Sequence, residues 1–143
     1  MREKFWELPI AALTRAEWEA LCDGCGKCCL HKLEDADTGE VHATNVACKL
    51  LDRRTGQCCN YRERKLHVPE CVRLTSDSVS RIDWLPSTCA YRLRAEGKPL
   101  FGWHYLVSGD RESVHAAGVS VRGWTVAEQD VGDIELHVVD REL

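Results

Sequence analysis

The sequence lacks the patterns that place a protein in a membrane or on a secretory route. No apolar run approaches the roughly 18–20 residues that a bilayer-spanning helix needs. The first residues, Met1 to Trp6, contain neither the apolar stretch nor the small-residue cleavage site of a secretory signal. We therefore expect a cytoplasmic protein that does not cross a membrane.

Signals for common catalytic and nucleic-acid sites are missing as well. The sequence contains no glycine-rich phosphate loop, no His-Glu-x-x-His pattern and no order of Ser, His and Asp that indicates a catalytic triad. Its net charge is −4, whereas a nucleic-acid-binding domain usually presents a basic face. The sequence therefore gives no positive indication of an enzyme, and we expect no nucleic-acid partner.

The length and the hydrophobic content are those of an ordinary globular chain. With 143 residues, of which 44% are hydrophobic, the chain is long enough to bury a core without a covalent staple. No low-complexity run or internal repeat divides it. We therefore expect a single domain over residues 1–143, with all the cysteines confined to residues 22–89.

Local patterns in the first half predict a short helix and short strands. Thr14 and Glu17 form a capping box, which predicts a helix that leads into the first cysteines. The glycine-containing stretch 37–40 predicts a turn between two strands within residues 30–44. A second turn is predicted at residues 54–57.

The second half of the chain is less regular. A helical turn is predicted at residues 61–66, and a helix through Cys89 is expected to stop at Gly97. Residues 119–126 alternate like a strand, and residues 131–139 are compatible with either a strand or a helix. Together these patterns predict an α+β fold with irregular backbone around the cysteines.

Cysteine is the residue type that departs most from an ordinary composition. The nine cysteines are Cys22, Cys25, Cys28, Cys29, Cys48, Cys58, Cys59, Cys71 and Cys89. Their number is odd, and a reducing cytosol disfavours disulfides. Cysteine clusters in a cytosolic chain more often bind metal or carry out redox chemistry, although the βαβ pattern expected around a thioredoxin-like motif is missing here.

The densest part of this pattern is the run of residues 22–29. Two overlapping Cys-x-x-Cys units share Cys25, and they resemble the three-cysteine run that holds an iron–sulfur cluster. Gly24 and Gly26 tolerate the positive φ angles of such a loop. Tetrahedral zinc is the alternative, and eight thiols are enough for two such sites.

Four positions near this run are ambiguous. Cys28 and Cys29 are adjacent, and in extended backbone their side chains point to opposite sides. They would then serve two different sites, or one of them would be spare. His31 and His67 lie close to cysteines in the sequence and are candidate ligands, because imidazole binds both zinc and iron.

Several segments of the sequence match the pattern of a known family. They are residues 21–29, Asn45 to Cys48, Cys58 to Arg64, Cys71, Trp84 to Pro86 and Thr88 to Arg92. In these segments the chain resembles the YcgN and YkgJ cysteine-cluster proteins, which are described as a proposed zinc- or iron-chelating domain. The resemblance extends over most of residues 5–125 and is closest to the YcgN branch.

The resemblance implies a metal centre and a set of ligands. The implied ligands are Cys22, Cys25, Cys28, Cys29, Cys48, Cys58, Cys71 and Cys89. Cys59 lies where the family pattern is variable, so we treat it as extra. The implied cofactor is iron, with an iron–sulfur cluster slightly favoured, or zinc, and the implied partner is a metal ion.

Three kinds of function are open for such a chain. A metal-chelating or metal-handling protein needs an exchangeable site, whereas a zinc-structured interaction module needs closed sites and a binding face. A redox or methyl-transfer enzyme needs an open coordination position and a pocket. A flagellin lysine methylase with an iron–sulfur centre is similar at a distance, but this chain lacks its additional regions.

We predict that Cys59→Ser keeps its full metal content whereas Cys25→Ser loses metal. Serine preserves the size of cysteine but offers a poorly ionised oxygen in place of a soft thiolate, so a true ligand is sensitive to the exchange. Elemental analysis after purification without chelators checks this. Equal losses in the two variants would show that the spare cysteine is assigned wrongly. Identical and non-additive losses in Cys28→Ser and Cys29→Ser would indicate one polynuclear centre.

Overall fold

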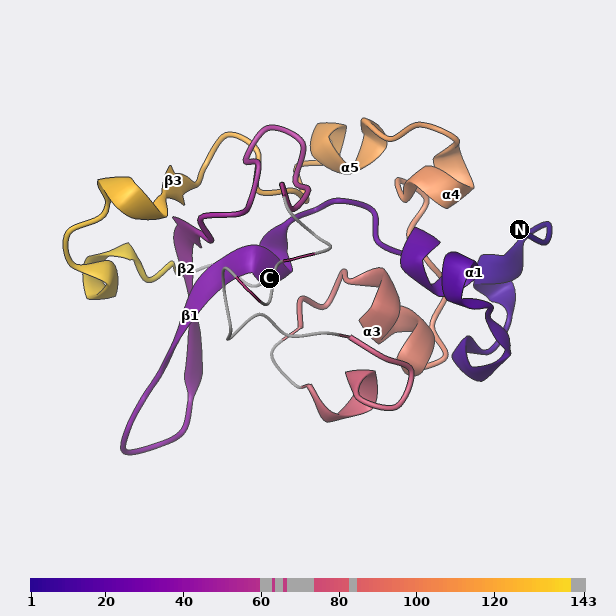
Figure 1. The fold of residues 1–143 in the computed structure, drawn as a ribbon, viewed down its shortest axis with the longest axis horizontal. Coiled ribbons are helices and arrows are strands. Elements are labelled where there is room, and N and C mark those ends of the chain that lie inside the picture. The colour runs from indigo at the N-terminus through magenta and orange to yellow at the C-terminus, as the bar shows by residue number, and fades with distance from the viewer. Residues whose placement is uncertain (60–62, 64–65, 67–73, 83–84, 140–143) are drawn as a thin grey trace. The chain divides into compact units, whose positions relative to one another are not determined.

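Short helices and one small sheet make up the described part of the chain (Figure 1). The computed structural model describes residues 1–59, 63, 66, 74–82 and 85–139. The helices there are α1 (Arg15–Ala20), α3 (Ala90–Ala95), α4 (Tyr105–Ser108) and α5 (Ser113–Ala116), and the strands are β1 (Leu30–Glu34), β2 (Val41–Ala47) and β3 (Val126–Ala127). Short 3₁₀ helices lie at Phe5–Glu7, Ile10–Ala12, Lys27–Cys29, Val79–Arg81, Glu128–Asp130 and Ile134–His137. Helices and strands do not alternate along the chain, so the predicted α+β class is confirmed.

The chain divides into two compact units, and each combines two segments of the sequence. Unit 1 consists of Met1–Cys25 and Val72–Val119, and unit 2 consists of Gly26–Cys71 and Ser120–Leu143. Unit 1 carries the four α-helices named above, and unit 2 carries the sheet. The single domain expected over residues 1–143 stays a prediction.

Helix α1 begins at the predicted capping box. The Thr14 hydroxyl accepts a hydrogen bond from the Glu17 backbone N–H (3.2 Å), and the Glu17 carboxylate accepts one from the Thr14 N–H (2.9 Å). Each side chain therefore satisfies a backbone donor of the other at the start of the helix. The helix is capped at its other end by the fully buried Leu21, which leads directly to Cys22.

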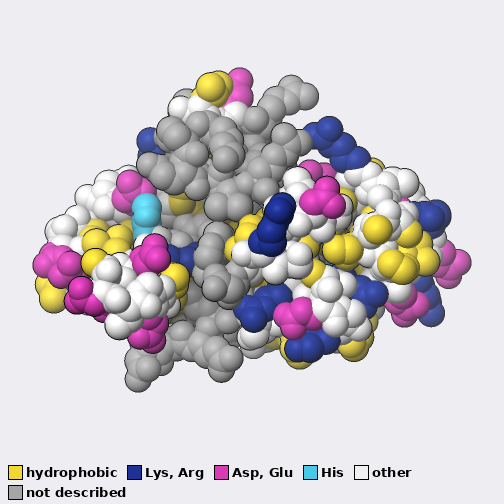
Figure 2. Space-filling model, turned by 90° about the horizontal axis from the view of Figure 1, so that it is seen from below, with side chains coloured by type: hydrophobic (Ala, Val, Ile, Leu, Met, Phe, Trp, Pro, Cys, Tyr) yellow, Lys and Arg dark blue, Asp and Glu magenta, His cyan; other side chains and the backbone are white. Residues whose placement is uncertain are grey.

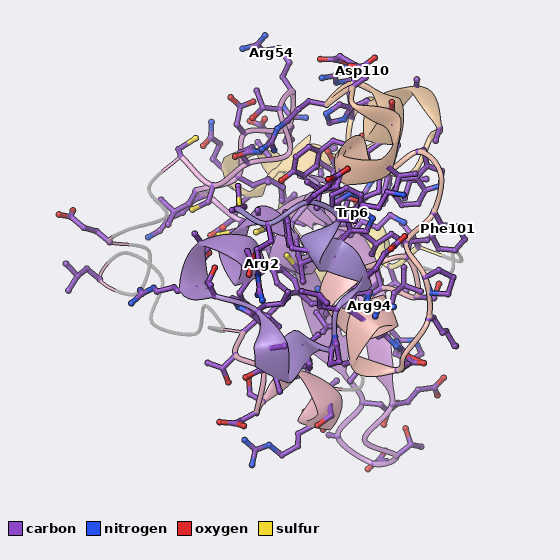
Figure 3. The ribbon with its side chains drawn as sticks, turned by 90° about the vertical axis from the view of Figure 1, so that its right-hand side faces the viewer. Arg2, Trp6, Arg54, Arg94, Phe101 and Asp110 are labelled. Atoms are coloured by element: carbon purple, nitrogen blue, oxygen red, sulfur yellow. The ribbon has the colours of Figure 1, made fainter. Side chains whose placement is uncertain are left out.

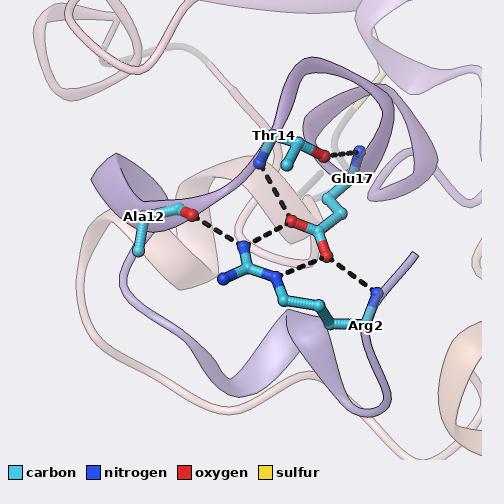
Figure 4. Close-up of polar contacts among 4 residues, drawn as sticks. All are labelled: Arg2, Ala12, Thr14 and Glu17. Atoms are coloured by element: carbon cyan, nitrogen blue, oxygen red, sulfur yellow. Dashed lines mark hydrogen bonds and ion pairs between the residues drawn. The ribbon is translucent and has the colours of Figure 1, made fainter.

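The same glutamate binds the N-terminal segment of the chain (Figure 4). The Arg2 guanidinium donates to both carboxylate oxygens of Glu17, at 2.6 and 3.1 Å, and the Arg2 backbone N–H donates to one of them at 3.1 Å. Only 1% of the Glu17 side chain is exposed, and a buried carboxylate is stable only when it is paired and hydrogen-bonded. The hydrogen bonds from Arg2 and Thr14 outweigh burial and hold the pKa of Glu17 well below its usual value.

An apolar cluster joins α1 to α3 in the core of unit 1. Its buried members are Phe5, Leu21, Val79, Leu85, Ala90 and Tyr91. Tyr91 of α3 packs against Trp18 of α1 with ring centroids 4.5 Å apart, and the Trp18 indole N–H donates to the Leu74 carbonyl. Arg94, also on α3 and labelled in Figure 3, donates to the Glu7 carbonyl at 3.3 Å. These contacts hold α1, and with it the start of the cysteine run, against the core.

The sheet of unit 2 is built on the predicted hairpin. Strands β1 and β2 pair antiparallel, and Gly39 in the turn between them adopts a φ of 73°. Strand β3 adds in parallel to β2 through the pair Val46 and Val126. Val138 pairs with Thr44, also on β2. Strand β2 is therefore central, and it leads the chain into the second group of cysteines.

One predicted strand is wrong. Residues 119–126 were expected to be extended, but only the last of them lies in a strand and the preceding residues form a tight turn. The Trp124 indole N–H donates to the Ser120 carbonyl (2.7 Å), and the Thr125 hydroxyl donates to the Val121 carbonyl (2.9 Å). These side chains therefore bind carbonyls that strand pairing would otherwise use, and this favours the turn.

Two further predictions have different outcomes. Within residues 131–139, whose pattern fitted a strand or a helix, the structure has the 3₁₀ helix Ile134–His137, followed by the single bridge at Val138. The helical turn predicted at residues 61–66 lies outside the described residues, apart from two isolated positions.

The described surface carries charges of both signs. On the face drawn in Figure 2, basic side chains are interspersed with acidic ones. Large apolar side chains are exposed at several positions, among them Phe101 at 44% and Val107 at 48%. None of the helices in the described ranges combines the length and the apolar character needed to cross a bilayer.

We predict that Glu17→Gln destabilises the protein at neutral pH and flattens the pH dependence of its stability. The folded-state pKa of Glu17 lies below its ordinary value of 4.5, so the ionised carboxylate stabilises the fold above that pH. This stabilisation is lost as the pH falls through the folded-state pKa. Thermal unfolding at a series of pH values measures it: the melting temperature of the wild type should fall more steeply below pH 4.5 than that of the variant.

Glu3→Gln is the matched control, because Glu3 is an exposed glutamate in the same terminal segment. It should leave both the melting temperature and its pH dependence unchanged. If the melting temperatures of the wild type and of Glu17→Gln fall equally steeply as the pH is lowered, the stabilising role of the Arg2–Glu17 pair is contradicted.

Candidate metal centre

The boundary between the two units falls inside the cysteine run, because Cys25 belongs to unit 1 and Gly26 to unit 2. Unit 1 contains Cys22, Cys25 and Cys89, and unit 2 contains Cys28, Cys29, Cys48, Cys58, Cys59 and Cys71. Cys71 lies outside the described residues, and the other eight are thiols rather than parts of disulfides. The predicted ligands are therefore divided into two groups, one in each unit.

In unit 2 the adjacent cysteines Cys28 and Cys29 lie in the 3₁₀ helix Lys27–Cys29. The premise of extended backbone is therefore wrong. The tight helical turn brings the two thiols close enough to hydrogen-bond to each other instead of pointing to opposite sides. Adjacent cysteines can thus belong to a single group.

Backbone pairing brings two more cysteines to the same part of unit 2. The Cys48 N–H donates to the Cys29 carbonyl at 2.8 Å. Both side chains pack against the buried apolar cluster that contains Leu51. Leu51 in turn pairs with Cys58 across the turn at residues 54–57, which confirms that predicted turn.

Crowding of sulfur atoms keeps the proton on Cys29. The hydrogen bond with Cys28 raises the pKa of the Cys29 thiol most, followed by burial. Negative charge at Cys28, Cys48 and Cys58 raises this pKa further. The charge of a bound cation would oppose this penalty on the ionisation of Cys29.

Glycines allow a close approach of the backbone beside these thiols. Gly24 and Gly26 have φ angles of 79° and 77°, as the sequence predicted. A Cβ atom at Gly26 would lie 2.9 Å from Cγ2 of Val121 and 3.3 Å from Cα of Gly56. Only glycine therefore fits at Gly26 without displacing its neighbours.

A carboxylate from a distant segment holds the backbone around this group. Glu128 accepts hydrogen bonds from the His31 Nε2 (3.0 Å) and from the backbone N–H of Lys49 (3.1 Å), the residue after Cys48. An ionised carboxylate can only accept, so His31 carries its proton on Nε2. If His31 is a metal ligand, as predicted, it can then bind the metal only through Nδ1. The sequence offered no signal for this contact, because the two side chains are 97 positions apart.

Two of the remaining candidates are placed less fully. Cys59 is exposed, and its backbone N–H donates to the Leu50 carbonyl at 2.6 Å. Its assignment as the extra cysteine stays a prediction. His67, like Cys71, lies outside the described residues.

In unit 1, the loop after α1 contains a buried carboxylate between two cysteines. Cys22 is exposed and Cys25 is buried. Asp23 between them is only 6% exposed, and its Oδ1 accepts the Cys25 N–H at 3.0 Å. Its Oδ2 is buried and has no hydrogen-bond partner among the described residues. Sequence reasoning treated this loop as a pair of thiols and missed the carboxylate.

Side chains of the α4 segment hold this loop in place. Nδ1 of the buried His104 accepts the Leu106 N–H (3.1 Å), so Nε2 carries the proton and donates to the Leu21 carbonyl (2.7 Å). Burial lowers the pKa of His104, which keeps the ring neutral. The Tyr105 hydroxyl donates to the neighbouring Ala20 carbonyl. The last carbonyls before the cysteine run are therefore held by two side chains.

Charged groups surround the tyrosine ring. The Arg111 guanidinium carbon lies 3.9 Å from the centre of the Tyr105 ring, a cation–π contact. Burial raises the pKa of Tyr105, and the positive charge of Arg111 lowers it in part. The charges of Cys22 and Asp23 raise the pKa of Tyr105 further. Tyr105 therefore lies within electrostatic reach of both the exposed thiol and the buried carboxylate.

The third cysteine of unit 1 comes from α3. This helix confirms the one predicted through Cys89, which is its N-cap. The helix ends before Gly97, whose φ angle is 73°. Cys89 packs against the apolar cluster that contains Leu21, the residue before Cys22. The same core therefore carries both segments that supply cysteines to unit 1.

Comparison with known proteins agrees with this cysteine pattern. Residues 21–90 match a family defined by a CxxCxxCC pattern and described as "Putative zinc- or iron-chelating domain". A UPF0260 protein of Rhizorhabdus wittichii is 69% identical over 140 residues, which cover 97% of this chain and 96% of that protein. The chain belongs to the UPF0260 family. Its closer placement in the YcgN branch stays a prediction.

Other UPF0260 proteins are similar over nearly the same length. The protein of Rhodobacter capsulatus is 63% identical over 132 residues, covering 92% of this chain and 89% of its own. The protein of Brucella canis is 57% identical over 131 residues, which cover 90% of this chain and 86% of that protein. No solved structure matches the chain.

The donor groups of this UPF0260 chain fit zinc or iron in their chemistry, because both metals take thiolate ligands. Within the described ranges, however, no three His, Cys, Asp or Glu side chains are arranged so that they could hold a metal ion. Ionised thiolates repel one another, so the charge of the ion is needed to draw them together. Closure of a site here would thus be coupled to metal binding.

We predict that Gly26→Ala destabilises the UPF0260 chain more than Gly39→Ala does. Both glycines have positive φ angles, and alanine in this conformation costs about 1–2 kcal/mol by itself. A Cβ at Gly26 also meets Val121 at 2.9 Å, whereas at Gly39 the nearest atom is 3.9 Å away. Urea unfolding under reducing conditions measures the difference. Equal free energies of unfolding for the two variants would contradict the close approach.

Proposed function

We propose that this UPF0260 protein binds zinc or iron in the cytoplasm through cysteine thiolates. The proposed ligands are Cys22, Cys25, Cys28, Cys29, Cys48, Cys58, Cys71 and Cys89. The observation that carries the proposal is the group of cysteines in unit 2, where the Cys48 N–H donates to the Cys29 carbonyl and Cys58 pairs with Leu51. The description of the family supports the same chemistry.

The division of the cysteines supports two ligand groups rather than one. Among the described residues, unit 1 supplies Cys22, Cys25 and Cys89, and unit 2 supplies Cys28, Cys29, Cys48 and Cys58. A tetrahedral thiolate site takes four ligands. Unit 2 therefore has enough described thiols for one such site, whereas unit 1 has three.

Two features favour different kinds of metal centre. The overlapping Cys-x-x-Cys units favour an iron–sulfur cluster, which takes several cysteines from one short run. The boundary between Cys25 and Gly26 favours separate ions of zinc or iron, because it divides that run between two units. Colour and sulfide content separate these two arrangements directly.

A metal-chelating or metal-handling role is the one we propose, ahead of a closed structural role. Among the described cysteines that we propose as ligands, each unit has one exposed thiol, Cys22 in unit 1 and Cys28 in unit 2. Exposed ligands can be reached by a competing chelator or by a partner that accepts the metal. In structural zinc sites, by contrast, all four positions are closed by the protein.

We predict that the protein, purified anaerobically without chelators, carries about one or more equivalents of zinc or iron per chain. Elemental analysis, acid-labile sulfide and ultraviolet–visible absorbance are the measurements. A brown protein with sulfide indicates an iron–sulfur cluster, and a colourless protein with zinc indicates zinc thiolates.

The double variant Cys29→Ser/Cys48→Ser should lose the metal of unit 2, because it removes two proposed ligands that a backbone hydrogen bond holds side by side. Cys59→Ser is its matched control and should lose none. Metal below about one tenth of an equivalent in the wild type, with sulfide also absent, would rule out the proposed function.

A further inference from the structure

We propose that the carboxylate of Asp23 is an oxygen ligand of the metal ion in unit 1, where it joins the thiolates of Cys22, Cys25 and Cys89. The inference rests on the proposed metal-binding function and extends it by naming a ligand that is not a cysteine. It gives unit 1 the fourth donor that its three cysteines lack.

The first argument is the environment of the carboxylate itself. Asp23 is only 6% exposed, and its Oδ1 already accepts the Cys25 N–H at 3.0 Å. Its Oδ2 is shielded from water and has no hydrogen-bond partner in the described part of the chain. An unpartnered carboxylate oxygen is strongly unfavourable in such a place unless a donor or a cation meets it.

The neighbouring polar groups do not supply that donor. The Nε2–H of His104 is bonded to the Leu21 carbonyl, and its Nδ1 accepts a hydrogen bond and therefore has no proton to give. The Tyr105 hydroxyl is bonded to the Ala20 carbonyl, and the Arg111 guanidinium lies over the Tyr105 ring. None of these three side chains therefore meets the buried oxygen, and a cation is a partner that fits it.

The position of the carboxylate points to the same cation as the thiols. The bond between Oδ1 and the Cys25 N–H turns the side chain of Asp23 into the Cys-x-x-Cys loop. Zinc accepts carboxylate oxygens beside thiolates within one tetrahedral site. No three-ligand group is preformed among the described side chains, so the carboxylate meets the ion as the loop closes on it.

An oxygen ligand changes the properties expected of the site. A carboxylate is a harder donor than a thiolate and binds a soft or borderline metal less strongly. The ion in unit 1 is therefore the exchangeable one, and the ion held by the four thiols of unit 2 is the retained one. This matches the chemistry of a divalent cation that is bound and passed on.

The test uses the full-length, reduced, metal-free protein titrated anaerobically with Co²⁺, whose visible and charge-transfer bands report its ligands. The wild type should bind two equivalents with different affinities. In Asp23→Asn the amide oxygen can still accept the Cys25 N–H, but the anionic oxygen is lost. The affinity for the weaker equivalent should fall by at least about tenfold, with a shift of its visible bands, while the stronger equivalent is unchanged.

Asp110→Asn is the matched control. Asp110 also lies in unit 1, and its Oδ1 also accepts the N–H two residues ahead, that of Glu112 at 2.9 Å, but its side chain is exposed (Figure 3). This variant should bind Co²⁺ like the wild type. Wild-type binding in Asp23→Asn would overturn the ligand role and leave the proposed function standing. A wild type that binds no Co²⁺ would overturn both.

A second measurement does not depend on the folding of a variant. X-ray absorption of the zinc-loaded wild type should show a light-atom shell at about 2.0–2.2 Å beside the sulfur shell at about 2.3 Å. In the folded Asp23→Asn variant, the contribution of light atoms to the X-ray absorption signal of the zinc should decrease. A shell of sulfur alone in the wild type would overturn the assignment of Asp23.

Discussion

The carbonyl groups at the end of α1 are held by side chains from the α4 segment, and the position of the first cysteines depends on these bonds. His104 binds the Leu21 carbonyl and Tyr105 binds the Ala20 carbonyl, so the helix stops at a defined point. Leu21 is also fully buried in the core of unit 1. The next residue is Cys22, which therefore leaves the helix from a fixed anchor rather than from a frayed end. This arrangement requires a neutral His104 ring, because Nε2 donates a hydrogen bond whereas Nδ1 accepts one.

Unit 2 places its cysteines by a different means, through backbone pairing and glycine. The 3₁₀ helix that carries Cys28 and Cys29 is preceded by its N-cap Gly26, and a backbone hydrogen bond joins Cys29 to Cys48. The result is a concentration of sulfur in which the pKa of Cys29 is raised by its neighbour Cys28 and by burial. The two units thus differ in kind: one combines thiols with a buried carboxylate, and the other gathers thiols alone. Metals that differ in softness would distinguish between them.

Local signals in the sequence predicted much of the fold, because they act over a few residues. The capping box at Thr14, the hairpin turn at Gly39 and the helix through Cys89 all appear where expected. The strand expected at residues 119–126 failed because two side chains bind nearby carbonyls, which alternation of apolar residues does not reveal. The cysteines were evident from sequence, whereas the contact of Glu128 with His31 and the burial of Asp23 depend on tertiary packing. No short-range pattern reports such contacts.

Both units are assembled from segments that are interleaved along the chain, and this has a consequence during synthesis. Unit 1 needs residues up to Val119, although it begins at Met1, and unit 2 needs the segment from Ser120 onward. Cys22 and Cys25 leave the ribosome long before Cys89, so these nucleophilic thiols wait in the nascent chain without the rest of their unit. Because domains generally fold as units during translation, the two groups of cysteines reach their places late and nearly together. Reducing agents and chaperones that shield cysteine from oxidation would therefore matter most for this protein while it is still being made.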